Sequence, residues 1–374
     1  MKIHQTLMNN KKYNDNFNSV PDDFGQKMKS PEEYYIKRCL ELAKNGLPSA
    51  MPNPSVGAVI VYENKIIGEG FTSAYGGSHA EVNAINSVKD KSLLSKSTIY
   101  VSLEPCSHFG KTPPCCDLIL KHAIPNIVIG TIDPNSKVAG NGIKKLTEAG
   151  KNVTVGVLEN ECIDSNKRFF TFHTKKRPYI ILKWAESLDG FLAPEKKEKK
   201  APVWITNEYS RQLVHKWRSE EMAILVGTKT VLDDNPQLDV RDWNGKNPVR
   251  IVLDRTGKIT ENYHVKDQKI KTIIITEQEN LTSFENLIYE NAIFDIHLPI
   301  KICSILFKYN LQSVIIEGGN KTLQTFIDAN FWDEARVFKG ENFFKSGIKA
   351  PILTRLYISE KIKNDELKLF FNHD

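Results

Sequence analysis

The stretch SHAEVNAI, residues 78–85, joins a histidine and a carboxylate to an apolar helical run. Val82 and Ile85 fall on one face of the expected helix, which predicts that this face packs against a core. His79 and Glu81 are two positions apart, so they point about 200° apart around a helix. Both side chains can reach one site only if that site lies over the N-terminal end of the helix. The stretch therefore predicts an amphipathic helix whose first turn faces a site.

Strand-like and helical segments alternate on both sides of this stretch. Ser30, Pro31 and Glu33 form a capping-box pattern that predicts the start of a helix, and Gly46 is expected to end it. The elements that follow are predicted as a hairpin of strands 55–62 and 65–71, the helix from about His79, strand 98–103, a helix from about Pro113, strand 126–131, helix 142–150 and strand 152–158. This alternation predicts a three-layer α/β domain over residues 30–158.

A second alternating pattern begins at Tyr179, after a segment 159–177 that we interpret as a connection. It predicts strands 179–185, 248–254, 271–276 and 312–319, a strand from 222, and helices 207–220 and 320–331. We therefore expect a second α/β domain over residues 178–374. Residues 193–202 have the composition of an exposed charged loop, and the polar, unperiodic residues 1–29 are expected to form an N-terminal extension.

The bulk composition excludes several classes of protein. A length of 374 residues accommodates two domains, and 40% hydrophobic with 26% charged residues is typical of globular chains. The net charge of +6 suits a phosphorylated substrate, and no dense basic stripe indicates nucleic acid. There is no apolar run of membrane-spanning length and no signal-peptide pattern. The six scattered cysteines do not form a disulfide framework, so we expect a cytoplasmic protein.

His79 and Glu81 match the first half of a zinc deaminase pattern, H-x-E followed by P-C-x-x-C. Such enzymes bind zinc through three protein ligands, and a carboxylate that is not a ligand moves the proton. Pro105–Cys106 supplies the next part, but Cys115 lies nine positions after Cys106 rather than three. Two prolines precede Cys115, which predicts a helix start where a thiolate is favoured. The chain thus offers a histidine at one helix start, a cysteine at a strand end and a second cysteine at another helix start.

One stretch in the second half has the composition of a phosphate-binding turn. EGGNKT, residues 317–322, follows a buried strand and leads directly into a helix, whose free amide groups favour an anion. No G-x-G-x-x-G pattern follows a strand, so the usual dinucleotide fingerprint is missing. Arg218 and Arg241 are candidates to bind a phosphate through their guanidinium groups.

Several motifs together resemble the bifunctional deaminase/reductase family of riboflavin biosynthesis. In the first half they are MPNPSVGAVIV (51–61), GGSHAEVNAI (76–85), EPCSHFGKTPPC (104–115) and DPNSKVAGNGIKKLTEAG (133–150). In the second half they are RPYIILKWAESLDG (177–190), WIT (204–206), VHKWRSEEMAILVGTKTVLDDNPQLDVR (214–241), PVRIVLD (248–254) and VIIEGGNKTL (314–323). The resemblance implies a cytidine-deaminase-like three-layer domain and a dihydrofolate-reductase-like α/β domain. The chain departs from the family at Ser78, Ser136 and Pro202, and a polar substrate contact is in doubt only at Pro202.

The resemblance also implies roles for individual residues. His79, Cys106 and Cys115 would bind one zinc ion, and Glu81 would move the proton. NADPH would contact Ala185, Trp204, Thr230, Asp234, Gly319, Asn320, Lys321, Thr322, Leu323, Gln324 and Thr325. The substrate of the reductase would contact Arg218, Leu238, Arg241 and Glu317, with Lys183 assisting the sugar chemistry. From their places in the sequence, Asn53 and His108 are further candidates for substrate contacts in the first domain, whereas Cys116 is expected to pack in its core.

The expected function is therefore zinc-dependent deamination of a phosphorylated pyrimidine, followed by NADPH-dependent reduction of its ribosyl group. The family suggests a homo-oligomer, with no nucleic acid or membrane as partner. A tRNA or nucleoside deaminase with an accessory binding domain would favour C-x-x-C spacing and a basic, aromatic face. A structural zinc protein would need a fourth ligand. A narrower possibility is a chain in which only one of the two domains is active.

Overall fold

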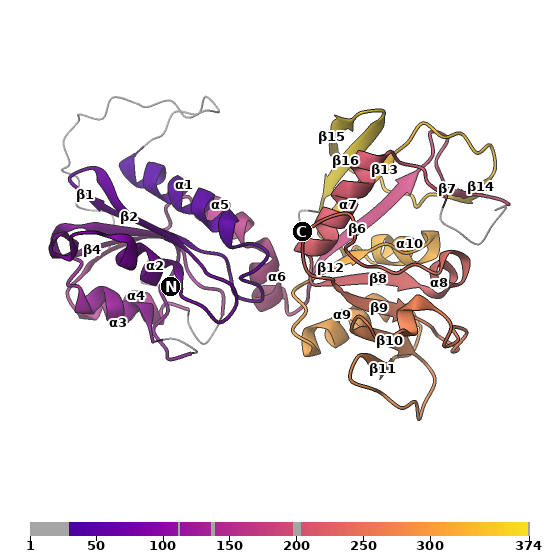
Figure 1. The fold of residues 1–374 in the computed structure, drawn as a ribbon, viewed down its shortest axis with the longest axis horizontal. Helices are drawn as coiled ribbons and strands as arrows, with labels where there is room; N and C mark the ends of the chain where they lie inside the picture. The colour runs from indigo at the N-terminus through magenta and orange to yellow at the C-terminus, as the bar shows by residue number, and fades with distance from the viewer. Residues whose placement is uncertain (1–29, 111–112, 136–138, 197–202, 373–374) are drawn as a thin grey trace.

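A computed structural model describes residues 30–110, 113–135, 139–196 and 203–372, so the extension 1–29, Ser136 and Pro202 lie outside the described residues. The first half contains one five-stranded sheet with the strand order β2-β1-β3-β4-β5 (Figure 1). β1 pairs antiparallel with β2 and β3, and β3, β4 and β5 run parallel. The strands are β1 (Gly57–Tyr62), β2 (Lys65–Phe71), β3 (Thr98–Leu103), β4 (Asn126–Thr131) and β5 (Asn152–Val155).

Helices cover both faces of this sheet because its strands alternate between two apolar sets. Val59, Val61 and Tyr100 pack against the helix α1, together with Cys162 of α5. Ala58, Ile60 and Ile99 belong to the core on the opposite face, beneath α2, α3 and α4. The bounds are α1 (Pro31–Ala43), α2 (Ala80–Ser87), α3 (Cys115–Lys121), α4 (Asn141–Glu148), α5 (Glu159–Ser165) and α6 (Lys167–Lys175), with short 3-10 turns at Lys44–Gly46 and Lys91–Lys96.

The helix termini follow the signals in the sequence. The Ser30 hydroxyl accepts a hydrogen bond from the Glu33 amide at 3.3 Å, as an N-cap should, and Pro31 occupies the first helical position. At the other end, Gly46 lies in a 3-10 turn that extends α1. The segment 159–177, predicted as a connection, folds into α5 and α6 and packs on the first sheet.

The second half contains a nine-stranded sheet with the order β11-β10-β9-β8-β12-β6-β13-β16-β15. The strands from β11 to β13 are parallel, and β16 and β15 add antiparallel at one edge. The bounds are β6 (Tyr179–Glu186), β8 (Ala223–Gly227), β9 (Val249–Leu253), β10 (Thr272–Thr276), β11 (Leu287–Asn291), β12 (Ser313–Ile316), β13 (Glu334–Lys339), β15 (Tyr357–Ile362) and β16 (Asp365–Phe371). β7 (Phe191–Pro194) and β14 (Gly347–Lys349) form a separate antiparallel pair.

Four helices cover the two faces of the second sheet. Residues of α9 (Leu298–Lys308) and α10 (Asn320–Asp328) share one core with the inner residues of β6, β8, β9 and β10. On the opposite face α7 (Glu208–Glu220) packs against β6 and α8 (Thr228–Asp234) packs against β8 and β9. No helix within the described ranges is long and apolar enough to cross a membrane.

Several elements of the second half had no clear signal in the sequence. α9 and the strands β11, β13, β15 and β16 were not predicted. β15 lies at the edge of the sheet, where five of its six residues are exposed, so it has no buried face to impose an apolar alternation. β13 is buried along five of its six positions, but Glu334 and Arg336 occupy two of them. Its sequence is therefore not a continuous apolar run of the kind that predicts a buried strand.

The packing of α1 on β1 allows a direct test of this architecture. A Cβ atom at Gly57 would lie 1.9 Å from the carbonyl oxygen of Cys39, so the helix would have to move away from the strand. We expect Gly57→Ala to lower the free energy of unfolding by about 3 kcal/mol, measured by urea denaturation. Gly110→Ala is the control, because an added Cβ there meets nothing within 4 Å. Equal stability of the two variants would contradict the tight packing.

Candidate functional site

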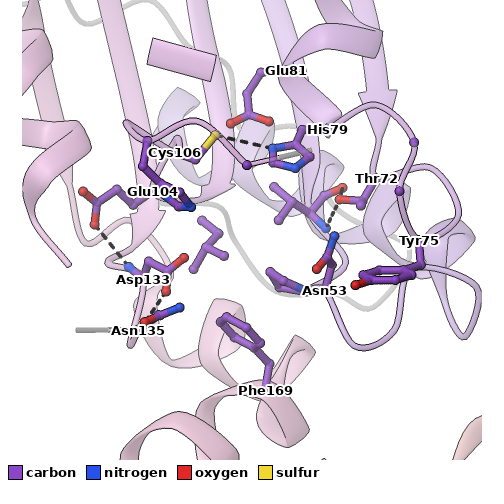
Figure 2. Close-up of a pocket in the computed structure, with 17 residues that line it drawn as sticks. Asn53, Thr72, Tyr75, His79, Glu81, Glu104, Cys106, Asp133, Asn135 and Phe169 are labelled. Atoms are coloured by element: carbon purple, nitrogen blue, oxygen red, sulfur yellow. Dashed lines mark hydrogen bonds between the residues drawn. The ribbon is translucent and has the colours of Figure 1, made fainter. Parts of the chain in front are cut away.

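Three predicted metal ligands meet above the N-terminal end of α2. His79 is the N-cap of this helix, Cys106 lies in the loop after β3, and Cys115 is the first residue of α3. Their ligand atoms all lie within 4.8 Å of one another. The Nδ1 atom of His79 is 3.6 Å from the Cys106 sulfur (Figure 2). It is 3.4 Å from the Cys115 sulfur. The nine-residue separation of the cysteines is thus no obstacle, because the intervening loop brings them together.

The donor set and its spacing fit a tetrahedral zinc ion. With Zn–S bonds of about 2.3 Å and Zn–N bonds of about 2.0–2.1 Å, sulfur and nitrogen ligands of one ion lie about 3.6 Å apart. The observed separations of 3.4 and 3.6 Å are close to that value. The hydrogen bond from the Cys115 thiol, with a smaller effect of His79, outweighs burial and lowers the pKa of Cys106 to about 4. One thiolate is therefore favoured even before a metal binds.

Glu81 reaches the same site from the first turn of α2. Its side chain is buried, and Figure 2 shows its carboxylate directed toward the Cys106 sulfur and the His79 imidazole. Burial, reinforced by the charge of Cys106 and partly opposed by His79, raises the pKa of Glu81 to about 7. Such a carboxyl group can both accept and release a proton near neutral pH.

His79, Cys106 and Glu81 line a cavity of about 250 Å³, whereas Cys115 is fully buried and is not part of its lining. Asn53 and His108, the two further candidates from the sequence, also line it. Cys116 does not, because its thiol is directed to the carbonyl oxygens of Pro105 and Gly142 in the core, as predicted. The remaining lining residues are Pro54, Val56, Thr72, Tyr75, Gly76, Gly77, Leu103, Glu104, Gly110, Asp133, Asn135 and Phe169.

Sequence reasoning missed the polar wall of this cavity. The Glu104 carboxylate accepts hydrogen bonds from the amides of Asp133, Gly140, Gly142 and Ile143 at 2.8–3.3 Å. Asp133 in turn accepts a hydrogen bond from the Asn135 amide at 2.8 Å (Figure 2). A usable signal was present, since the Asp-Pro-Asn stretch directly follows β4, at the sheet edge where β3 delivers Cys106.

A second cavity, of about 850 Å³, lies at the carboxyl ends of parallel strands in the nine-stranded sheet. Among the predicted cofactor contacts, those that line it are Ala185, Trp204, Thr230, Asp234, Gly319, Asn320, Lys321, Thr322 and Thr325. Leu323 and Gln324 do not. Leu323 is fully buried in the core, and the Gln324 side chain bonds to Asp328 and Ile352. Helical periodicity explains this, because positions 323 and 324 of α10 turn away from the face that carries Thr322 and Thr325.

The glycine turn before α10 has the shape of an anion cradle. Gly319 is the N-cap of α10 and lies after β12, and no side chain caps the helix. A Cβ atom at Gly318 would lie 2.7 Å from the Thr322 Cβ, and one at Gly227 would lie 2.8 Å from the Thr322 hydroxyl. The turn therefore requires glycine where two backbone segments approach α10, and the helix dipole favours a phosphate there.

A buried charge cluster borders the same cavity. Arg218 donates two hydrogen bonds to the Glu317 carboxylate, at 2.9 and 3.3 Å, and the Lys183 amine lies 3.7 Å from the same group. Burial alone would raise the pKa of Glu317, but Arg218 and Lys183 outweigh it and lower this pKa to about 2. Burial lowers the pKa of Lys183, although Glu317 partly opposes the shift. One carboxylate thus faces two cations, which leaves an excess positive charge for an anionic ligand.

The other predicted substrate contacts lie close to this cluster. Leu238 and Arg241 line the cavity, and the Arg241 amide donates to the Nδ1 atom of His215 at 3.4 Å. His215 was not predicted. It is buried and lies within 3.3 Å of the Asp242 carboxylate, and a histidine in the middle of an amphipathic helix gave no distinguishing signal.

The two halves of the chain match two different family models. Residues 29–131 match the cytidine and deoxycytidylate deaminase zinc-binding region, and residues 178–340 match the RibD C-terminal domain. These matches confirm the fold class predicted from the sequence, with a deaminase-like domain followed by a reductase domain.

Complete relatives show the same arrangement. The riboflavin biosynthesis protein RibD of Aquifex aeolicus is 40% identical over 89% of this chain and 93% of its own length. The RibD protein of Escherichia coli is 33% identical over 90% of this chain and 96% of its own. The solved structure of a diaminohydroxyphosphoribosylaminopyrimidine deaminase/5-amino-6-(5-phosphoribosylamino)uracil reductase from Thermotoga maritima is 38% identical, with a TM-score of 0.80 over 92% of this chain and 99% of that chain. With a zinc-binding deaminase domain and a reductase domain in one polypeptide, the chain belongs to the RibD family of bifunctional riboflavin biosynthesis enzymes.

Proposed function

We propose that the chain catalyses two consecutive reactions, one in each cavity. The first is hydrolysis of 2,5-diamino-6-ribosylamino-4(3H)-pyrimidinone 5′-phosphate, in which water replaces a ring amino group and ammonia leaves. The second is reduction of the product, 5-amino-6-(5-phosphoribosylamino)uracil, to 5-amino-6-(5-phosphoribitylamino)uracil with NADPH. The observation that carries the proposal is that the ligand atoms of His79, Cys106 and Cys115 meet beside Glu81 at the wall of one cavity. The name of the Thermotoga maritima relative supports the same pair of reactions.

In the first cavity, His79, Cys106 and Cys115 would hold zinc with a fourth position left for a water molecule. Zinc in such a site supplies a hydroxide nucleophile at neutral pH. Glu81 would take up the proton of the water and pass it to the departing ammonia, for which a pKa of about 7 is suited. Asp133 and Asn135 offer hydrogen-bonding groups to the pyrimidine on the polar wall of the cavity.

The role of Glu81 is tested by Glu81→Gln. This change keeps the side-chain volume but removes the proton carrier, so we expect ammonia release to fall by on the order of 100-fold or more. Zinc content, measured by metal analysis, should stay at one ion per chain. The control is reduction of the deaminated product with NADPH, which uses the other cavity and should be unchanged. Ammonia release at the unaltered rate would exclude Glu81 as proton carrier.

In the second cavity, the turn at Gly318 and Gly319 would hold the phosphates of NADPH, which supplies a hydride when bound. The buried cluster of Lys183, Arg218 and Glu317 lies beside this turn and would position the sugar of the substrate. Arg218 and Arg241 are the groups suited to the 5′-phosphate, because a guanidinium can bind two phosphate oxygens at once. Lys183, whose pKa burial lowers, is the candidate to give or take a proton at the sugar.

Arg218→Ala tests the phosphate contact. Loss of a charge-assisted contact should raise the KM for the phosphorylated substrate of the reductase by roughly 10-fold to 100-fold. The same variant should show a much smaller effect with the dephosphorylated substrate, which lacks the group that Arg218 would bind. Deamination provides the internal control and should be unchanged. An equal effect on both substrates would show that Arg218 acts only on Glu317.

The preference for NADPH over NADH is proposed to depend on Arg255. This residue lies in the loop after β9, and β8 and β12 separate that strand from β6, which carries Lys183. A cofactor whose phosphates lie at the glycine turn after β12 would therefore reach Arg255 with the end that is away from Lys183. Its side chain is 59% exposed, and its guanidinium group pairs with the Glu277 carboxylate at 2.7 Å. An exposed cation that lines the cavity is suited to the extra phosphate of NADPH.

Arg255→Met should therefore reduce the ratio of kcat/KM for NADPH to that for NADH by about 10-fold, since one charge-assisted contact is lost. Arg211→Met is the matched control. Arg211 also lines the cavity, but it packs over Trp204 and should affect both cofactors alike. An unchanged ratio in Arg255→Met would place recognition of the extra phosphate elsewhere.

The homo-oligomer and the cytoplasmic location remain predictions from the sequence.

A further inference from the structure

The helix α6 lies between the two sheets and contacts both (Figure 1). It lies between the two matched regions, of which the first ends at residue 131 and the second begins at residue 178. Phe169 and Phe170 pack in the core of the first sheet. Phe172, on the same helix, stacks on Phe307 of α9 with ring centroids 4.5 Å apart. One helix therefore belongs structurally to both halves of the chain.

Phe169 also forms part of the deaminase cavity. It lines the cavity together with His79, Cys106 and Glu81, and Figure 2 shows its ring directed into the cavity from the side opposite Glu81. The Phe169 ring also contacts the His173 ring, with the two ring centroids 4.4 Å apart. A flat apolar ring in this position is suited to pack against the face of a heteroaromatic substrate.

Side chains on either side of Phe169 fix it to the two domains. On the first domain, Asn166 exchanges two hydrogen bonds with the backbone of Ser55, both 2.9 Å long, where the chain enters β1. On the second domain, Arg168 forms a two-pronged ion pair with Glu221, including a hydrogen bond of 2.7 Å from its Nε atom. Glu221 directly follows α7, the helix that carries Arg218. A bidentate pair sets orientation as well as distance, so α6 cannot turn without breaking it.

The ion pair is too deeply buried to be broken without consequence. The Glu221 side chain has no exposed surface, and its second cation is Arg336, at 3.8 Å. Loss of Arg168 would leave a buried carboxylate with a distant partner, which strongly favours rearrangement. The nearest rearrangement available to α6 is a rotation that carries Phe169, the next residue, with it.

We propose that Phe169 positions the pyrimidine in the deaminase cavity, and that the Arg168–Glu221 ion pair makes this position depend on the reductase domain. The inference rests on the proposed deamination reaction. The deaminase site is thus completed by a residue that neither matched region contains, and its geometry is held from the second domain.

The first experiment measures ammonia release by the full chain with the diamino-pyrimidine phosphate as substrate. Phe169→Ala and Phe169→Leu should raise KM by about 10-fold or more with kcat changed by less than about threefold, because a ground-state contact is lost. Phe169→Tyr keeps the flat ring and should restore the KM. Phe170→Ala is the matched control: Phe170 packs in the same core but does not line the cavity, so it should lower stability and leave KM unchanged.

The second experiment tests the dependence on the reductase domain. Arg168→Met should raise KM in the same direction as Phe169→Ala, and the double variant should be no worse than Phe169→Ala alone. Zinc content should stay unchanged in every variant. Unaltered KM in Phe169→Ala and Phe169→Leu, or an equal rise in Phe170→Ala, would overturn the role of Phe169. Unaltered KM in Arg168→Met would overturn the dependence on the second domain. Failure of the unsubstituted protein to release ammonia would instead overturn the proposed function.

Discussion

A carboxylate that is largely removed from water must have its charge compensated where it lies, and three largely buried glutamates organise this molecule under that constraint. Glu104 is compensated by four backbone amides of the loop and helix after β4. Glu221 is compensated by Arg168 and Arg336 at the junction of the domains. Glu317 is compensated by Arg218 and Lys183 in the second cavity. Each glutamate fixes segments that are distant in sequence, and each lies at or beside a place where a ligand is expected.

The kind of compensation decides what each carboxylate can do. Glu104 is bound by four backbone amides, which ties the polar wall of the deaminase cavity to the loop and helix after β4. Arg218 and Lys183 are side chains that can turn toward an anionic ligand, so the charge cluster around Glu317 can adapt when a phosphate arrives. Glu81 differs from both, because burial, reinforced by the charge of Cys106 and partly opposed by His79, raises its pKa to about 7. Without a fixed cation or a cluster of amides beside it, Glu81 is the glutamate suited to carry a proton.

Much of the first domain could be predicted because its signals are local. The capping residues of α1, the alternation of β1 and the order of His79, Cys106 and Cys115 are all visible in the sequence. The polar wall was missed, because Glu104 meets residues about thirty to forty positions away and the one local signal was the Asp-Pro-Asn stretch after β4. In the second domain, most of the residues named from the family resemblance line the cavity, yet they also included Leu323 and Gln324, which helical rotation turns away. The role of α6 was missed because the segment 159–177 lies between the two alternating patterns and was interpreted as a connection, although the helix carries three buried phenylalanines.

The shared helix α6 bears on how this polypeptide could have evolved. Division of the gene between the two sheets would leave each sheet with its own core. A cut at residue 158 would nevertheless separate the first sheet from Phe169 and Asn166, whereas a cut at residue 177 would separate Arg168 from Glu221. Either product would have to replace a lost contact before it worked alone. Fusion of the two activities is therefore easier to maintain by selection than to reverse.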